Sequence, residues 1–461
     1  MCNTETQPLL ASKQRNPKYL NRNYGKNRDA TTSTGVESKK EHWKSWIIVA
    51  AAFYSLFILN GAEYAFGSLM EQLMKQTGLA RSTISIAGST QVALSAFTAP
   101  LASLMINKMG TLKVTTIGSI MAMVGFLGSS FATEIIGVFT GLSVLAGSGF
   151  GLMYMPAMVA VAENFDQQRT LALALTLCGP AAGQVVLSPL MTWLTDTYGW
   201  RGCLRALSIL CASSILTGRV LKQPSRDPSS EVEEEDNFQI VDHERPILAW
   251  ILGDKLSRHQ YVWVFVLLIL ADSFAVMALF IPYSYIQPVA AIVNIPPHLT
   301  SILIAIIGLG SIMGRLTSSF LTKNPKVKSL FLIRASIALV SILPIVFTLI
   351  DQFWMFALAC FMFGFLTGQW IAATSPFLVQ LLGIFNINKA LGLLTFVQGA
   401  ASLISPPLAG ISVEMSSNPL MALYVSAFLL MISATVYTTA ILVMDKKRCR
   451  IITYDRFYSE I

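Results

Sequence analysis

The stretch KQPSRDPSSEVEEEDNFQIVDHERPILAWILGDKLSRH, residues 222–259, is the one long hydrophilic connection in this chain. It includes the acidic run from Glu231 to Asp236, which is typical of a solvated, disordered hinge. On both sides of this hinge, long apolar blocks alternate with short turns. Six blocks precede it, at 46–70, 82–106, 112–132, 135–161, 169–193 and 201–221, and six follow it, at 260–288, 299–321, 328–350, 353–379, 389–413 and 419–443.

These blocks predict an all-α membrane protein with twelve transmembrane helices in a 6+6 architecture. A helix rises about 1.5 Å per residue, so each block is long enough to cross about 30 Å of hydrocarbon. Of the 461 residues 54% are hydrophobic and only 13% are charged, about half the charged fraction of a soluble domain. A soluble fold of this length would need a charged surface, so that class is excluded.

The short loops predict the orientation and the division of the chain. With both tails cytoplasmic, the inner loops hold more Lys and Arg than the outer loops, as the positive-inside rule requires. This orientation accounts for the net charge of +8 without a nucleic-acid partner. We expect a cytoplasmic disordered tail at 1–45, a six-helix bundle at 46–221, a cytoplasmic hinge at 222–259, a second six-helix bundle at 260–443 and a cytoplasmic tail at 444–461.

Two six-helix halves joined by a long loop are the pattern expected of a secondary transporter. In such folds each half consists of inverted three-helix repeats, and the solute binds near the middle of the membrane between the halves. The halves then rock, so that the site opens to one side of the membrane at a time. The lipid bilayer is therefore the first partner that the sequence predicts.

Catalytic and metal-binding patterns are missing from the sequence. It has no P-loop, no His-Glu-x-x-His and no Gly-x-Ser-x-Gly. All four histidines lie outside the apolar blocks or at their ends, and four of the six cysteines lie inside blocks without metal-ligand spacing. We expect no enzyme, no metal and no cofactor. The polar N-terminus has no apolar signal-peptide core, so we expect the first helix to act as the insertion signal.

Several short patterns resemble the monocarboxylate transporter family of the major facilitator superfamily. A tight basic turn, NKMGTLK at 107–113, links the second and third blocks, as is typical across that superfamily. Arg169, Leu171 and Ala172 open the fifth block and lead to Gly179 and Gly183. Further patterns follow in the family's order: YGWRG at 198–202, ALGLL at 390–394, QGAA at 398–401 and PPLAG at 406–410. Small residues of this kind let helices approach closely.

The resemblance implies the major facilitator architecture and a function. It implies a solute carrier for a monocarboxylate or related small organic solute, working by alternating access in the plasma membrane. It also implies a small organic anion as ligand, proton coupling and a single-span ancillary subunit as further partners. An acidic dileucine pattern, Glu5 to Leu10, leaves an endosomal or lysosomal membrane open, and a chance match in a disordered tail is the alternative.

The sequence departs from the family at positions that matter for mechanism. The proton-lactate carriers have a Lys late in helix one, whereas this chain reads YAFGS at 64–68. On helix eight those carriers have an Asp four residues before an Arg; here Arg315 matches, but Ser311 takes the place of the Asp. A non-transporting sensor or partner-binding membrane protein on the same scaffold is therefore the alternative function.

Three charged residues inside the apolar blocks are the first candidates for a site. A charge inside a membrane costs several kcal/mol unless it is paired or hydrated. Arg315 can donate two parallel hydrogen bonds to a carboxylate, so we expect it to anchor an anionic solute. Glu63 in the first helix and Asp272 in the seventh are candidates for the compensating charge or for proton coupling. A fixed ion pair between Arg315 and one of these carboxylates is the alternative.

Uncharged polar residues within the blocks complete the candidate set. Tyr154, Gln184, Gln369 and Gln398 could contact solute, although hydrogen bonds to adjacent helices are the commoner role. By the resemblance alone, Thr367 and Ile371 fall at positions on helix ten that face substrate in the family. The predicted solute-binding set is Arg315, Glu63, Asp272, Ser311, Tyr154, Thr367, Ile371 and Gln369.

Overall fold

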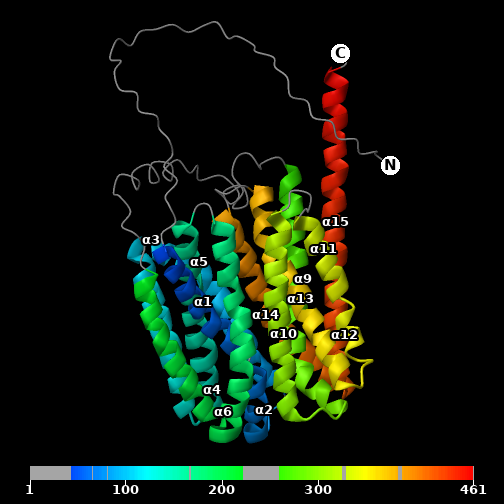
Figure 1. The fold of residues 1–461 in the computed structure, drawn as a ribbon. Coiled ribbons are helices and arrows are strands. Elements are labelled where there is room, and N and C mark those ends of the chain that lie inside the picture. Colours follow the sequence, from blue (N-terminus) through cyan, green and yellow to red (C-terminus); the bar gives the residue numbers. More distant parts are fainter. Residues whose placement is uncertain are drawn as a thin grey trace, which may run out of the picture. The chain divides into compact units, whose positions relative to one another are not determined.

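The computed structural model describes residues 43–64, 66–79, 81–165, 168–221, 259–323, 329–382 and 387–459. All regular secondary structure in these residues is helical, which confirms the predicted fold class (Figure 1). Most of the predicted N-terminal tail and nearly all of the predicted hinge lie outside the described residues. The helices are α1 Trp43–Tyr64, α2 Phe66–Thr77, α3 Arg81–Phe131, α4 Ile135–Phe139, the π-helix η1 Thr140–Ala146, α5 Gly147–Asn164, α6 Arg169–Val220, α9 His259–Ile292, α10 Pro297–Lys323, α11 Ser329–Val340, α12 Leu343–Val346, α13 Phe353–Leu382, α14 Ile387–Ser416 and α15 Leu420–Ser459.

Two of these helices are far too long for one membrane crossing. Within the described residues, ten helical segments are long and apolar enough to span a membrane, and α3 and α6 contain 51 and 52 residues. A straight helix of 51 residues would extend about 77 Å, more than twice the hydrocarbon thickness. Each contains one glycine with a positive φ angle, 79° at Gly110 and 71° at Gly199. Only glycine adopts this conformation at little cost.

Contacts with a neighbouring helix show that the chain reverses direction at Gly110. Before Gly110, α3 runs in the same direction as the fourth span, which consists of α4, η1 and α5. A Cβ added to Gly147 would lie 2.6 Å from the Gln91 carbonyl oxygen, and four residues further along both helices a Cβ added to Gly151 would lie 2.3 Å from the Ser95 carbonyl oxygen. After Gly110, α3 runs in the opposite direction to the fourth span, because Gly118 lies against Gly149 whereas the later residue Gly125 lies against the earlier residue Gly141. The helix α3 is thus two spans joined by a glycine turn, and we assign the same division to α6 at Gly199 from its length and positive φ angle. Counting both pairs makes twelve spans.

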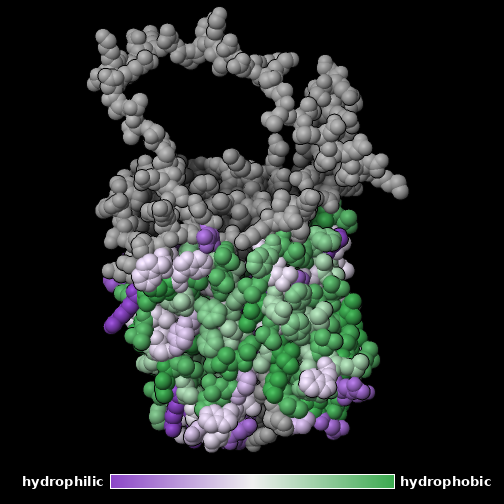
Figure 2. Space-filling model, in the orientation of Figure 1, coloured by the Kyte–Doolittle hydropathy of each residue, from purple (hydrophilic) through white to green (hydrophobic). Residues whose placement is uncertain are grey.

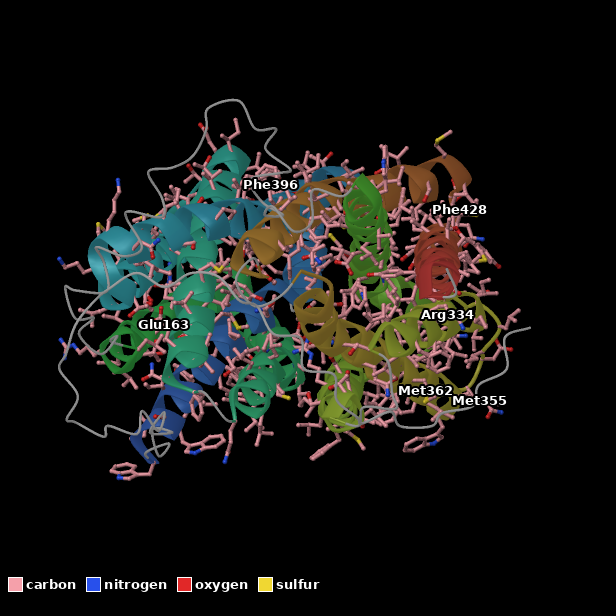
Figure 3. The ribbon with its side chains drawn as sticks, turned by 90° about the horizontal axis from the view of Figure 1, so that it is seen from above. Glu163, Arg334, Met355, Met362, Phe396 and Phe428 are labelled. Atoms are coloured by element: carbon pink, nitrogen blue, oxygen red, sulfur yellow. The ribbon has the colours of Figure 1, made fainter. Side chains whose placement is uncertain are left out.

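Large apolar side chains cover the outside of the helices. Figure 2 shows hydrophobic residues across the middle of the visible face and hydrophilic residues toward its two ends. Trp354 and Leu349 are 80% and 75% exposed. Met355, Met362 and Phe428 are also exposed and lie at the periphery of the bundle when it is seen from above (Figure 3). Apolar exposure on this scale fits a lipid-facing surface.

The helices form two groups that correspond to the two sequence halves. In Figure 1, α1 to α6 lie on one side and α9 to α15 on the other. The groups meet mainly where α3 packs on α14 and where α6 packs on α10. At the α3–α14 contact, the Phe97 and Phe396 rings have centroids 4.9 Å apart. The bundle boundaries at 46–221 and 260–443 stay predictions, because residues 222–258 are not described.

The ninth and the twelfth predicted spans differ in extent from the observed helices. The ninth block, expected at 328–350, is divided into α11 and α12. Pro344 lies at the start of α12 and has no N–H to donate to the Val340 carbonyl, so the first helix ends there. The last helix, α15, continues to Ser459 instead of ending near 443. Hydropathy marks where a chain leaves the lipid, and polar residues such as Lys and Arg can continue a helix beyond that point.

Candidate solute-binding site

Arg315 lies on α10 at the contact between the two halves. Its side chain is only 4% exposed. One guanidinium nitrogen, Nη1, donates a hydrogen bond to the backbone carbonyl of Leu177 on α6. Its Nε is buried and has no hydrogen-bond partner among the described residues, and no ion pair to Arg315 occurs among them. The fixed ion pair considered above is therefore not formed, and part of the guanidinium is available to an anion.

Three tyrosines lie near this guanidinium. Tyr64 of α1, Tyr154 of α5 and Tyr283 of α9 are all within electrostatic range of Arg315. The Tyr64 and Tyr283 rings have centroids 4.8 Å apart. Because these residues come from both halves, the phenol groups and the guanidinium mark a polar centre between the halves. Tyr154 was predicted for the site; Tyr64 and Tyr283 were not, because hydropathy does not separate tyrosines that face a cavity from those that face lipid.

Glu63, next to Tyr64 on α1, lines a small cavity that Tyr64 and Tyr283 also line. The cavity lies between α1, α2, α3, α9 and α14. The carboxylate has a side-chain hydrogen bond with Ser95. Its Oε1 is buried and has no partner among the described residues. Glu63 and Arg315 are both within electrostatic range of Tyr64 and Tyr154.

Gln184 joins the two halves near this centre. Its Nε2 donates a hydrogen bond of 2.8 Å to the Ile304 carbonyl on α10, and its side chain is also hydrogen-bonded to Tyr283. Gln184 is 1% exposed. Of the two roles considered for this residue, the structure shows the hydrogen bond to an adjacent helix. Breaking that bond is a requirement for any motion that separates α6 from α10.

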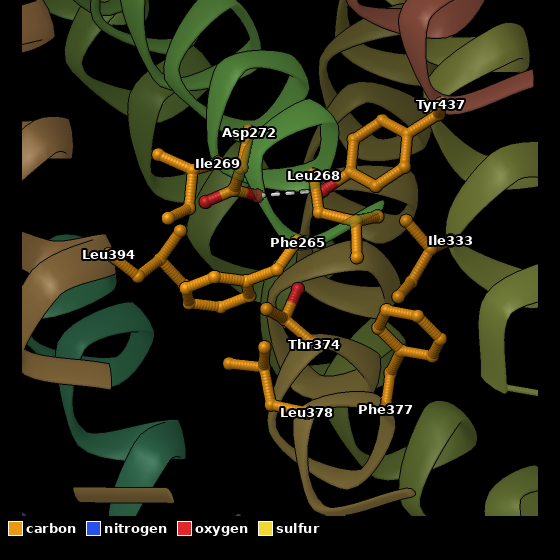
Figure 4. A pocket seen from close by; sticks show the side chains of 10 residues that line it. All are labelled: Phe265, Leu268, Ile269, Asp272, Ile333, Thr374, Phe377, Leu378, Leu394 and Tyr437. Carbon is orange, nitrogen blue, oxygen red and sulfur yellow. Dashed lines mark hydrogen bonds between the residues drawn. The ribbon is translucent and has the colours of Figure 1, made fainter. Parts of the chain in front are cut away.

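Asp272 belongs to a different cluster, inside the second half. Its Oδ1 accepts hydrogen bonds from Trp370 Nε1 at 2.9 Å and from the Tyr437 hydroxyl at 3.0 Å, and its Oδ2 accepts one from Gln398 Nε2. Figure 4 shows Asp272 and Tyr437 among apolar neighbours such as Phe265. Four helices, α9, α13, α14 and α15, are thus tied together by one buried carboxylate. The structure does not bring Asp272 to Arg315, which the sequence prediction had grouped with it.

The remaining predicted site residues lie in packing contacts. The Thr367 hydroxyl donates to carbonyls of its own helix, those of Phe363 at 2.8 Å and Gly364 at 3.0 Å. Gln369 accepts a hydrogen bond of 3.2 Å from Ser336. Two further contacts belong to the same helices: Ile371 packs against the apolar core of the second half, and the Ser311 backbone lies directly against Gly368. A role of these residues toward solute stays a prediction.

Comparison with known proteins agrees with this architecture. Residues 52–406 match the model of the Major Facilitator Superfamily. The chain is 23% identical to monocarboxylate transporter 12 of Rattus norvegicus over 428 residues, covering 89% of this chain and 87% of that protein. It is 26% identical to monocarboxylate transporter 4 of Rattus norvegicus over 386 residues, covering 82% and 78%. With human monocarboxylate transporter 11 it shares 26% identity over 384 residues, covering 79% and 76%.

A solved structure supports the fold independently of these sequences. The crystal structure of the peptide transporter POT in complex with sulfate superimposes with a TM-score of 0.64, covering 87% of this chain and 94% of that one at 11% identity. The predicted resemblance to monocarboxylate transporters is thus confirmed at 23–26% sequence identity. The matching superfamily consists of transporters and not of enzymes. The chain belongs to the major facilitator superfamily and is a multi-pass membrane transporter.

Proposed function

We propose that this transporter carries a monocarboxylate or a related small organic anion by alternating access, with Arg315 as the anion anchor. The observation that carries the proposal is the Arg315 guanidinium, which is buried between the halves with Nε unpartnered among the described residues. A buried cation without a counter-ion is costly, so a ligand carboxylate would offset that cost. The distant monocarboxylate transporters support this class of solute.

The contacts of Arg315 suggest how binding would be linked to motion. Its hydrogen bond to the Leu177 carbonyl connects α10 of one half to α6 of the other. A carboxylate bound to Nε and a second guanidinium N–H would pull the guanidinium toward itself and so draw Nη1 away from this carbonyl, because charge-assisted pairs are stronger than bonds to a neutral acceptor. Solute binding would then weaken one of the contacts that hold the halves together. The Gln184 bond to Ile304 would have to break in the same movement.

Proton coupling and the membrane are further parts of the proposal. Glu63 is a better candidate for carrying a proton than Asp272, because Asp272 already accepts three hydrogen bonds whereas Glu63 Oε1 accepts none among the described residues. We place the carrier in the plasma membrane and allow for a single-span ancillary subunit, on the analogy with monocarboxylate transporters.

Uptake into proteoliposomes tests the proposed role of Arg315 as the anion anchor. Purified protein should take up a labelled short-chain carboxylate, and Arg315→Ala should abolish that uptake. Arg205→Ala is the matched control: Arg205 is an exposed arginine of α6 that stacks on Phe131 at 5.0 Å, so uptake should persist. Carboxylate uptake by Arg315→Ala at the wild-type rate would remove the anchor role. Absence of uptake for every solute tested would favour the alternative, a non-transporting sensor. The presence of Ser311 where the proton-lactate carriers have an Asp is the reason to consider that alternative.

A further inference from the structure

Two glycines of the second half lie where the halves touch. Gly308 of α10 faces α6, and a Cβ added to it would lie 2.8 Å from the Ala181 carbonyl oxygen and 2.8 Å from the Val185 Cγ2. Gly399 of α14 faces α3, and a Cβ added to it would lie 2.7 Å from the Ala96 Cβ. Both glycines are buried. At each of the two main contacts between the halves, the second half therefore approaches through a residue without a side chain.

Both contacts lie in the middle of the helices that form them. Gly308 and Gly399 are near the midpoints of α10 and α14, and their partners Ala181 and Ala96 are near the middle of the fifth and the second predicted span. Glycine is a poorer helix former than alanine, so helix stability does not account for glycine at these positions. Small residues in membrane helices allow close approach of the backbones. The halves thus approach each other through glycine near half the depth of the bundle.

Among the described residues, hydrogen bonds between α6 and α10 lie on both sides of Gly308. Before it on α10, the Ile304 carbonyl accepts the bond from Gln184. After it, Arg315 donates to the Leu177 carbonyl. A rotation of one half about Gly308 would separate the helices at one of these bonds and press them together at the other. The arrangement of the two bonds therefore suits a rocking motion with its axis at the glycine contact.

Another glycine contact between the halves lies away from the middle. Gly67 is at the start of α2, and a Cβ added to it would lie 3.2 Å from the carbonyl oxygen of Tyr283, toward the end of α9. Gly67 is buried in this contact. The displacement produced by a rotation grows with distance from the axis. The contact at Gly67 must therefore open when the halves rock, whereas a contact on the axis stays closed.

We propose that Gly308 and Gly399 are the pivots of the transport cycle: their contacts with α6 and α3 persist while the contact at Gly67 opens and closes. A side chain at either pivot would hold the backbones apart and displace the axis. The inference rests on the alternating access of the proposed function, because rocking halves need an axis. It depends neither on Arg315 nor on the identity of the solute.

A disulfide across one pivot tests the inference. Val185→Cys with Gly308→Cys suits the geometry, because Val185 Cγ2 already lies where a cysteine sulfur would lie, beside the Cβ position of residue 308. Gly67→Cys in the same protein reports the motion, since a maleimide reaches position 67 only when the buried contact opens. We expect the labelling rate at position 67 in proteoliposomes to be unchanged when the disulfide forms. The wild type sets the background, because its cysteines in the described part of the chain are buried.

A covalent link at the contact away from the middle should have the opposite effect. Gly67→Cys and Ser284→Cys replace residues that line the same cavity, and a short bifunctional maleimide joins them. We expect this link to abolish uptake of labelled propionate, whereas the disulfide between positions 185 and 308 should leave uptake at the rate of the reduced protein. The inference is overturned if the pivot disulfide stops labelling at position 67. It is also overturned if position 67 is never labelled, or if uptake survives the link at Gly67.

An exchange of residues across the second pivot decides the question if the disulfide variant does not fold. Gly399→Ala brings its Cβ to 2.7 Å from that of Ala96, so labelling of Gly67→Cys and propionate uptake should both slow. Ala96→Gly in the same protein removes the opposing methyl group and should restore both rates. Rates that stay low after Ala96→Gly would overturn the inference. If position 67 is labelled through the pivot disulfide but no solute is taken up, the proposed function fails and the pivots stand.

Discussion

Substitution of Gly364 by alanine should separate two helices that now touch through their backbones. Gly364 lies on α13, and a Cβ built there would lie 1.9 Å from the Ile307 carbonyl oxygen on α10 and 2.7 Å from its carbonyl carbon. Three other glycines between α10 and α13 are packed as tightly. Cβ atoms added to Gly310, Gly314 and Gly368 would lie 2.0 to 2.4 Å from carbonyl oxygens of the opposing helix. The obstacle is backbone in each case, so no side-chain rotation can relieve it.

The magnitude follows from the separation required. To move that Cβ from 1.9 Å to an ordinary contact distance of at least 3.4 Å, the helices must part by about 1.5 Å locally. A gap of this order forfeits a large share of the dispersion energy of the atoms on either side, and overpacking of a core costs about 1–3 kcal/mol. We expect Gly364→Ala to lower the free energy of unfolding by about that amount.

Unfolding by a denaturing detergent, followed through intrinsic fluorescence, measures the effect. Gly128→Ala is the control, because a Cβ on this exposed glycine of α3 would meet nothing within 4 Å. Alanine is also the better helix former, so the control should lose no stability and could gain up to about 1 kcal/mol. Equal stability of the two variants would refute the idea that backbone contact between α10 and α13 holds the second half together.

Three other substitutions have expected outcomes. Asp272→Asn should destabilise the protein by about 1–3 kcal/mol in the same unfolding assay, because the Gln398 amide would face another amide in place of a carboxylate, whereas unchanged stability would remove the bracing role. Arg315→Lys should keep the charge but lower kcat/KM for carboxylate uptake by about tenfold or more, since a lysine cannot form the planar fork; wild-type kinetics would contradict this. Gly110→Ala should cost about 1–2 kcal/mol from its φ angle of 79° alone, since no atom lies within 4 Å of the added Cβ, and a stability equal to that of the wild type would show that the turn relaxes without strain.

The sequence by itself determined the membrane class, the twelve spans and their approximate ends. Hydropathy suffices for this because a helix in lipid must cover about 30 Å with apolar side chains, a requirement that acts on local sequence. It also identified the turn at 107–113, where Gly110 reverses the chain, and it selected Arg315 as the buried cation. Local hydropathy could not show that α15 runs on past the lipid or that Pro344 divides the ninth span.

Only the tertiary structure decided which polar groups meet. Asp272, predicted beside Arg315, is held instead by Trp370, Tyr437 and Gln398, which lie 98, 165 and 126 positions away in the chain. Likewise, the sequence could name Glu63 as a buried carboxylate but not show that an aromatic cavity adjoins it. Partners on different helices are brought together by the crossing of those helices, and their crossing depends on packing over the whole bundle, which no local pattern records.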